Sequence, residues 1–163
     1  VGQGSRFDVY FPSVRSNLDH TVSDETPLSS SRGHETILLV EDDASVRELI
    51  RDELKNMGYR VLESKNGLEA CLVATQQVGN FQLLLTDVVM PRMGGKELIK
   101  WVRTLHPKIK VLFISGYTDH TLPHHAGLKP GSPFLQKPFS PTALAKKVRE
   151  VLDQTNKQIF SFF

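Results

Sequence analysis

The chain has few of the features that would assign it to a disulfide-stabilised, membrane-spanning or nucleic-acid-binding class. Its 163 residues include one cysteine, Cys71, so no disulfide can form within the chain. No apolar run approaches the roughly 18 residues that a helix needs to cross a bilayer, and no secretory signal pattern is evident. The formal net charge of +2 is too small to indicate a nucleic-acid partner. We therefore expect a soluble, cytoplasmic protein without direct membrane contact.

Composition divides the chain into four parts. Residues 1–12 read as a glycine turn followed by an alternating strand, and residues 13–33 have the Ser-, Asp- and Thr-rich composition of a linker. Residues 34–154 alternate between strand and helix patterns, and their hydrophobic content is sufficient for a core. Residues 155–163 form a tail that contains three phenylalanines outside the expected fold. We expect one folded domain, over residues 34–154.

Strands and helices alternate through this domain. The strand patterns occupy residues 36–41, 59–64, 81–87, 110–115 and 133–137. The first is a short apolar run without alternation, as in a strand covered on both faces, whereas residues 59–64 are a weaker strand expected nearer an edge. Helical spacing follows at residues 45–58, 67–79, 96–107 and 140–154, the last opening with a capping Ser140 and Pro141. Two prolines and two glycines leave room for only a short helix within residues 117–131. The order predicts an α/β fold with a doubly wound parallel sheet and helices on both faces.

Polar residues stand where four of these strands end. In open α/β sheets, ligands bind beyond the carboxyl ends of the strands. The residues at these ends are Glu41, Asp42, Asp43, Asp87, Ser115 and Lys137. Clustered carboxylates resist ionisation unless a cation is nearby, and oxygen ligands with open positions suit Mg²⁺. A lysine and a hydroxyl can donate to phosphate oxygens, so the set predicts a site for Mg²⁺ and a phosphoryl group, with Asp87 as nucleophile.

Four motifs in this order resemble those of two-component receiver domains. They are LLVEDD (38–43), LLTDVVMPRMGG (84–95), ISGYT (114–118) and FLQKPF (134–139), and the resemblance extends from His34 to about Gln154. It implies a flavodoxin-like sheet of five strands in the order 2-1-3-4-5. It also implies a phosphoacceptor that takes its phosphoryl group from a phosphohistidine, by a transfer that the receiver itself catalyses, and then changes conformation.

The resemblance also implies a role for each site residue. Asp87 would be the phosphoacceptor, and Lys137 would bind the phosphate. The peptide between Lys137 and Pro138 would be cis, which would aim Lys137 over the site. Asp43 would bind Mg²⁺ directly and Asp42 through water, with the backbone carbonyl of Val89 completing the protein ligands. Ser115 would be the switch hydroxyl and Phe134 the switch aromatic residue, although packing in the core alone would explain Phe134.

Other interpretations of the same residues remain open. The acid before the first helix could cap it, and Ser45 with Glu48 could form a capping box. A phosphatase of the haloacid dehalogenase class would need a second acid two residues after Asp87, where Val89 stands. A degenerate receiver that binds partners without phosphate is a further alternative. His120 and His124 have the spacing of a zinc pair, but Pro123 between them disfavours the helix that this pair would need.

The N-terminal segment VGQGSRFDVYFP resembles the last turn and strand of a histidine-kinase ATPase domain. A disordered leader is the alternative description of residues 1–12. The resemblance implies a hybrid histidine kinase as the parent protein, with the receiver after its kinase. The donor would then be a kinase dimerisation domain or a histidine phosphotransfer protein. The ATP-binding motifs are absent from these residues, so this chain is not expected to bind ATP.

Overall fold

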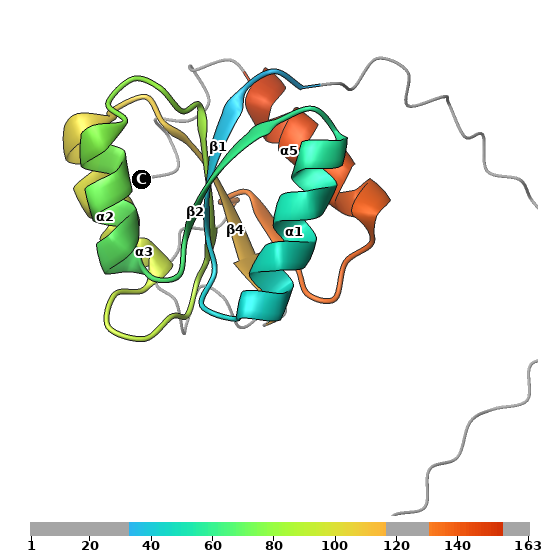
Figure 1. Ribbon diagram of the computed structural model, residues 1–163, viewed down its shortest axis with the longest axis horizontal. Helices are drawn as coiled ribbons and strands as arrows, with labels where there is room; N and C mark the ends of the chain where they lie inside the picture. Colours follow the sequence, from blue (N-terminus) through green and yellow to red (C-terminus); the bar gives the residue numbers. More distant parts are fainter. Residues whose placement is uncertain (1–32, 117–130, 155–163) are drawn as a thin grey trace, which may run out of the picture.

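The computed structural model describes residues 33–116 and 131–154, which form one sheet between two layers of helices (Figure 1). The strands are β1 (Thr36–Val40), β2 (Arg60–Ser64), β3 (Leu83–Asp87), β4 (Lys110–Ser115) and β5 (Phe134–Gln136). The helices are α1 (Ala44–Asn56), α2 (Gly67–Gln76), α3 (Gly95–Leu105) and α5 (Pro141–Asp153). In this described part, no helix has the length and apolar character needed to cross a membrane.

Several predictions fall on residues that the structure does not describe. These are the kinase-like segment 1–12, the linker up to residue 32, the short helix within 117–131 and the tail 155–163. The histidines of the zinc alternative, His120 and His124, also lie outside the described residues. The predictions for these segments therefore stay predictions.

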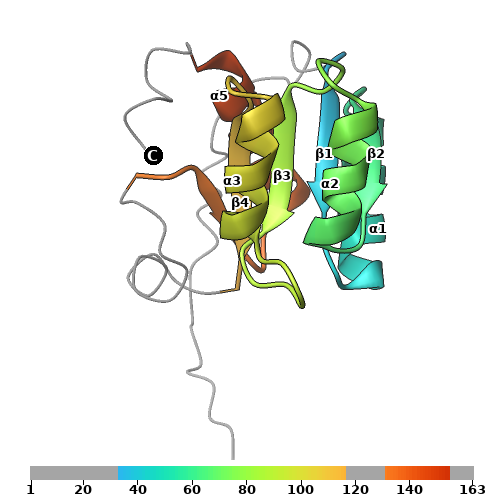
Figure 2. The same cartoon turned by 90° about the vertical axis from the view of Figure 1, so that its left-hand side faces the viewer.

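The five strands are parallel and lie in the order β2-β1-β3-β4-β5, which confirms the predicted fold class. The crossovers from β1 to β2, from β2 to β3 and from β3 to β4 pass through α1, α2 and α3, as is usual between parallel strands. Because the strands run in one direction, their carboxyl ends meet at one edge of the sheet, which is the lower edge in Figure 2. The residues that follow β1, β3, β4 and β5 are thereby gathered at that edge.

Apolar side chains cover both faces of the sheet. On β1, Leu38 and Val40 belong to the cluster under α2 and α3, whereas Ile37 and Leu39 belong to the cluster under α1 and α5. All four side chains are fully buried. Successive residues of a strand point to opposite faces, so a strand covered on both sides must be apolar throughout. This explains why the apolar run at residues 36–41 does not alternate.

Helix α2 lies close to its neighbours because its buried face consists of small residues. Ala70 and Ala74 are fully buried and Cys71 is 8% exposed, while Leu68 and Leu72 point outward. Burial raises the pKa of the Cys71 thiol, and its Sγ lies 3.7 Å from the Sδ of Met93. Cys71 is therefore a free thiol buried in the core.

An ion pair joins the start of the sheet to the last helix. Glu35 Oε1 accepts a hydrogen bond from Arg149 Nη2 at 2.8 Å, and Glu35 Oε2 accepts one from the backbone N–H of His34 at 3.0 Å. Burial by itself would raise the pKa of Glu35, but these hydrogen bonds and the charge of Arg149 lower it to about 2. The ionised form of Glu35 is therefore favoured by the fold.

Replacing Glu35 by Gln should lower the free energy of unfolding at pH 7 by on the order of 2 kcal/mol. Because the pKa of Glu35 is depressed in the folded state, its contribution exists above its ordinary pKa of 4.5 and is lost as the pH falls toward 2. Denaturant unfolding at several pH values should thus show the difference narrowing below pH 4.5. The control is Glu150→Gln, which removes an exposed ion pair with Lys147 on α5, the helix that carries Arg149. It should change the free energy of unfolding by less than about 0.5 kcal/mol. Equal effects of the two substitutions would contradict this account.

Candidate functional site

Three carboxylates meet at the carboxyl edge of the sheet. One oxygen from each of Glu41, Asp42 and Asp87 lies within 4.8 Å of the other two. Glu41 and Asp42 follow β1, and Asp87 is the last residue of β3, the strand beside it. Glu41 is 1% exposed. The sheet therefore brings together three oxygen donors, of which one is almost completely removed from solvent.

Lys137 bridges two of these carboxylates. Its Nζ donates to Glu41 Oε2 at 2.7 Å and to Asp87 Oδ2 at 2.8 Å. The residue follows β5, and its backbone N–H donates to the carbonyl of Ser115 at 2.7 Å, which extends the pairing of β4 and β5 by one step. The Lys137–Pro138 peptide is cis, as predicted. One ammonium group thus ties the first, third and fifth strands together at this edge.

The electrostatics of the bridge reflect both burial and pairing. Burial raises the pKa of Glu41, and the hydrogen bond and charge of Lys137 offset only part of that increase. Burial would lower the pKa of Lys137, but its hydrogen bonds to Asp87 and Glu41 outweigh this, so the pKa is raised. Lys137 is therefore held in its charged form, while Glu41 is ionised at a net cost to the fold.

Both oxygens of Asp87 have a hydrogen-bond donor. Lys137 donates to Oδ2, and the backbone N–H of Val89 donates to Oδ1 at 3.0 Å. Behind Asp87, α3 starts so close that a Cβ on Gly95 would lie 2.6 Å from the Asp87 carbonyl oxygen. A residue with a side chain at position 95 would displace the backbone of Asp87. The carboxylate is therefore fixed in direction on a rigid strand end.

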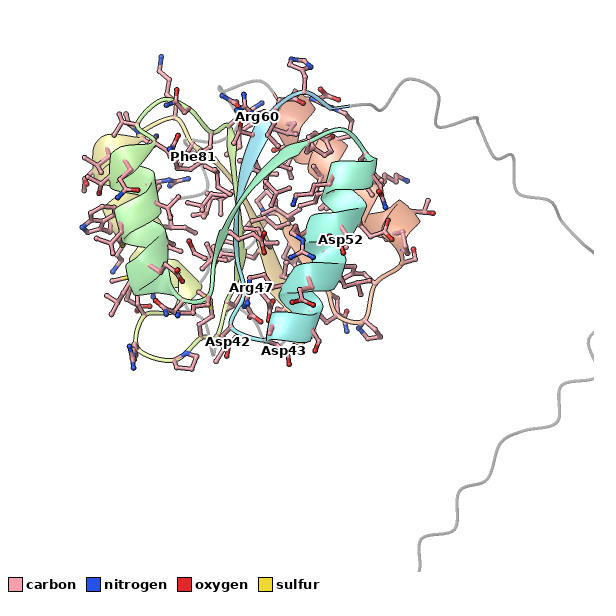
Figure 3. The ribbon with its side chains drawn as sticks, in the orientation of Figure 1. Asp42, Asp43, Arg47, Asp52, Arg60 and Phe81 are labelled. Carbon is pink, nitrogen blue, oxygen red and sulfur yellow. The ribbon has the colours of Figure 1, made fainter. Side chains whose placement is uncertain are left out.

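Asp43, the predicted direct Mg²⁺ ligand, is used differently in the structure. It is the N-cap of α1, where its Oδ1 accepts a hydrogen bond from the Val46 N–H at 3.0 Å. Figure 3 shows Asp43 at the lower end of α1, with Asp42 beside it at the end of β1. The group of three carboxylates that the structure brings together contains Glu41 in place of Asp43. The capping interpretation thus describes Asp43, whereas Ser45 is not the capping residue.

Glu41 was predicted at this edge but not as a metal ligand, and the position of the helix start explains why the structure groups it with Asp42 and Asp87. The motif LLVEDD offers three consecutive acids after the first strand, of which two were assigned as metal ligands. The sequence pattern did not show whether the following helix begins at residue 44 or 45. A carboxylate three residues before Val46 has the spacing of an N-cap. If Asp43 takes that role, Glu41 and Asp42 remain for the edge of the sheet.

Ser115 lies on β4, and Phe134 lies on the neighbouring strand β5, which leads directly to Lys137. Ser115 is the last residue of β4, is 1% exposed and pairs in register with Gln136 of β5. Phe134 starts β5, is partly buried and packs against the apolar cluster under α2 and α3. Its packing accounts for its presence in the fold, and the switch roles of both residues stay predictions.

Comparison with protein families gives a match over most of the chain. The model of the response regulator receiver domain matches residues 37–149. This range contains Glu41, Asp42, Asp87 and Lys137, which are the residues that meet at the carboxyl edge.

Two curated relatives come from Brucella abortus (strain 2308). The sensor kinase CckA is 32% identical over 164 residues, which cover 94% of this chain and 17% of the kinase. The response regulator receiver protein CpdR is 34% identical over 116 residues, which cover 71% of this chain and 95% of CpdR. The chain therefore spans less than a fifth of the first relative and nearly the full length of the second.

Solved structures show the same arrangement. The receiver domain of the hybrid histidine kinase CckA has a TM-score of 0.62 at 36% identity, with 72% of this chain and 99% of that chain covered. The response regulator TrrA of Thermotoga maritima, solved in complex with Mg²⁺ and BeF, has a TM-score of 0.62 at 27% identity. The match covers 72% of this chain and 98% of that chain.

Replacing Glu41 by Gln should raise the free energy of unfolding at pH 7, in buffer free of divalent cations, by on the order of 1 kcal/mol. Because the fold raises the pKa of Glu41, this carboxyl binds a proton more readily in the folded state than in the unfolded state. At higher pH the ionised carboxylate therefore lowers the free energy of unfolding. The gain should therefore shrink as the pH falls through the ordinary pKa of 4.5, because Glu41 then binds a proton in the unfolded chain as well. Denaturant unfolding at pH 4 and pH 7 measures this gain, with Glu48→Gln, at an exposed position of α1, as control. A clear loss of stability at pH 7 in Glu41→Gln would show that pairing with Lys137 outweighs burial.

Proposed function

This chain belongs to the response regulator receiver family, whose members act as phosphoacceptors in two-component signalling, and we propose that Asp87 is its phosphoacceptor residue. The observation that carries the proposal is the geometry of Asp87. Its carboxylate stands at the end of a central strand, with Val89 N–H on one oxygen and Lys137 Nζ on the other. A nucleophile must be presented in a fixed direction, and these contacts provide that.

The reaction would transfer a phosphoryl group from a phosphohistidine to Asp87. An oxygen of the Asp87 carboxylate attacks phosphorus, an O–P bond forms and the P–N bond to the imidazole breaks. The imidazole leaves with the bonding electron pair, and the product on Asp87 is an acyl phosphate. Lys137 already contacts the nucleophile, so its ammonium is placed to donate to a phosphoryl oxygen as charge develops there.

The residues present fit a divalent cation. Three carboxylates and one ammonium leave an excess of negative charge on hard oxygen donors, which suits Mg²⁺. We propose Glu41, Asp42 and Asp87 as the carboxylates that hold it, with the Val89 carbonyl as the backbone ligand. When bound, the ion would neutralise charge on the transferred phosphoryl group. The Mg²⁺ and BeF complex of the related TrrA supports this choice of ion.

Signal output is proposed to follow from the same edge. Ser115 ends the strand beside β3, and its neighbour in register leads to Lys137. A hydroxyl at this position could donate to the phosphoryl group, and Phe134 on the next strand could turn inward in response. This is the conformational switch that the resemblance implies for these two residues.

A hybrid histidine kinase is proposed as the parent protein. The alignment with the sensor kinase CckA covers 94% of this chain, which is more than the receiver match at residues 37–149. This supports assigning residues 1–12 to the end of a kinase ATPase domain and residues 13–33 to a linker. The donor would be a histidine on a kinase dimerisation domain or on a phosphotransfer protein, and the location would be cytoplasmic.

The two alternatives make different demands on the site. A haloacid dehalogenase phosphatase needs an acid two residues after its nucleophile, and position 89 carries a valine whose side chain is exposed. A degenerate receiver needs no phosphoacceptor, whereas here Asp87, Asp42 and Lys137 are brought together. Phosphorylation therefore remains the function that this arrangement supports best.

Replacing Asp87 by Asn should abolish Mg²⁺-dependent labelling by acetyl phosphate, because the amide has the same shape but is not a nucleophile. Phosphate-affinity electrophoresis would show the phosphorylated form of the unaltered protein as a retarded band, and the variant should give none. Circular dichroism should show the fold retained. A retarded band of normal intensity in the variant would place the acceptor elsewhere, and none in the unaltered protein would favour the degenerate receiver.

The neighbouring acids offer a matched pair of substitutions. Asp42→Asn should lower the Mg²⁺-dependent rate of phosphorylation at least about tenfold, because a proposed metal ligand is lost. Asp43→Asn should leave the rate within about twofold, because asparagine caps a helix as well as aspartate does. The phosphorylation rates of the two variants, measured with acetyl phosphate, show whether Asp42 or Asp43 is the principal metal ligand. The reverse result would restore Asp43 as the principal ligand.

A further inference from the structure

Arg47 contacts the turn formed by Glu41, Asp42 and Asp43, in addition to its place in helix α1. Its Nη1 donates to the backbone carbonyl of Glu41 at 2.8 Å. The side chain is 18% exposed, and its Nε lies 3.9 Å from Glu63 Oε2 on the edge strand β2. In Figure 3, Arg47 lies on the side of α1 that faces the strands, close to Asp42. The guanidinium thus joins α1, β2 and the turn that carries two of the three carboxylates.

The position of Arg47 in the helix is unfavourable for a cation. It is the fourth residue of α1, near the amino end, where the helix dipole favours negative groups. The first turn of α1 contains no acidic residue, although the capping Asp43 precedes it and the Glu63 carboxylate lies 3.9 Å from Arg47 Nε. A positive side chain at this place needs a compensating contact, and the bond to the Glu41 carbonyl supplies one.

Besides the first helical bond, from the Arg47 N–H to the Asp43 carbonyl at 2.9 Å, three bonds hold the turn from Glu41 to Asp43. The Glu41 N–H donates to the Ser64 carbonyl at 3.2 Å, the Glu41 carbonyl accepts from Arg47, and Asp43 caps α1. The carbonyl of Glu41 and the N–H of Asp42 belong to one planar peptide unit. Fixing the carbonyl therefore fixes the plane from which the side chains of Glu41 and Asp42 both extend.

From these contacts we infer that Arg47 is a positioning residue for the acidic site: by holding the Glu41–Asp42 peptide, it sets the direction of two proposed Mg²⁺ ligands. This inference rests on the proposed function, since it concerns the same three carboxylates. Without the guanidinium, the carbonyl could turn to solvent, and the Asp42 carboxylate would move away from that of Glu41, which Lys137 still holds. The site would then have to be reordered each time a cation binds.

The sign of the effect separates positioning from simple electrostatics. Arg47 is a cation, so removing it should by charge alone strengthen the binding of Mg²⁺. Loss of positioning should weaken it, by about tenfold for a partner that orients a ligand. A purely structural role would lower the free energy of unfolding and leave the affinity for Mg²⁺ unchanged.

The test is a titration of the full chain with Mg²⁺, followed by amide NMR, for Arg47→Met and Arg51→Met. Arg51 is the matched control: it lies one turn later on α1, its Nη1 is 3.6 Å from the same Glu63 carboxylate and its Nε pairs with Asp52. The dissociation constant for Mg²⁺ should rise about tenfold in Arg47→Met and by less than about twofold in Arg51→Met. In the metal-free proteins, the amide signals of Asp42 and Asp43 should move in the first variant only.

Arg47→Lys provides a second measurement if Arg47→Met does not fold. It keeps the charge but loses the planar fork of donors, so the dissociation constant should rise by about two- to fivefold. An unchanged or lower constant in whichever Arg47 variant folds overturns the inference, as does an equal rise in Arg51→Met. If the unaltered protein does not bind Mg²⁺, the proposed metal site fails as well. If it binds and the Arg47 variant matches it, the inference alone fails.

Discussion

The bridge made by Lys137 is the interaction on which the carboxyl edge of the sheet depends. Glu41 and Asp87 are like charges placed on neighbouring strands, and Glu41 is nearly inaccessible to water. Such a pair would repel strongly in a region of low dielectric constant. The ammonium of Lys137 contacts Glu41 at 2.7 Å and Asp87 at 2.8 Å, and Lys137 follows β5, the strand at one side of the sheet. It allows a reactive, negatively charged site to exist in the folded protein before any cation arrives.

The same bridge explains why the site is poised for change. Lys137 offsets only part of the burial cost of Glu41, whose pKa stays raised. A divalent cation or a phosphoryl group would alter the balance of charge at three strand ends simultaneously. Because Lys137 also continues the backbone pairing of β4 and β5, a change at Asp87 can reach Ser115 and Phe134 through bonded neighbours. In the function we propose, phosphorylation and the conformational response would share one set of contacts.

Much of this could be predicted from the sequence, and the part that could not has a specific cause. Uninterrupted apolar strands alternating with helices predicted the doubly wound sheet, and polar residues at the strand ends predicted Asp87 and Lys137 as partners. Choosing among Glu41, Asp42 and Asp43 required the start of α1 to within one residue, which a periodic pattern does not provide. The contact of Arg47 with a backbone carbonyl was also out of reach, since a carbonyl leaves no trace in the residue pattern.

The most direct test of the account is an amide NMR comparison of the protein with Mg²⁺ alone and with Mg²⁺ plus beryllofluoride, a phosphoryl mimic. If Asp87 is the phosphoacceptor and Lys137 its partner, the signals of Asp87, Val89, Ser115 and Lys137 should move together on adding beryllofluoride. Those of Glu35 and Thr36, at the opposite edge of the sheet, should stay in place. Unchanged signals at Asp87 and Lys137 under saturating beryllofluoride would contradict the central claim.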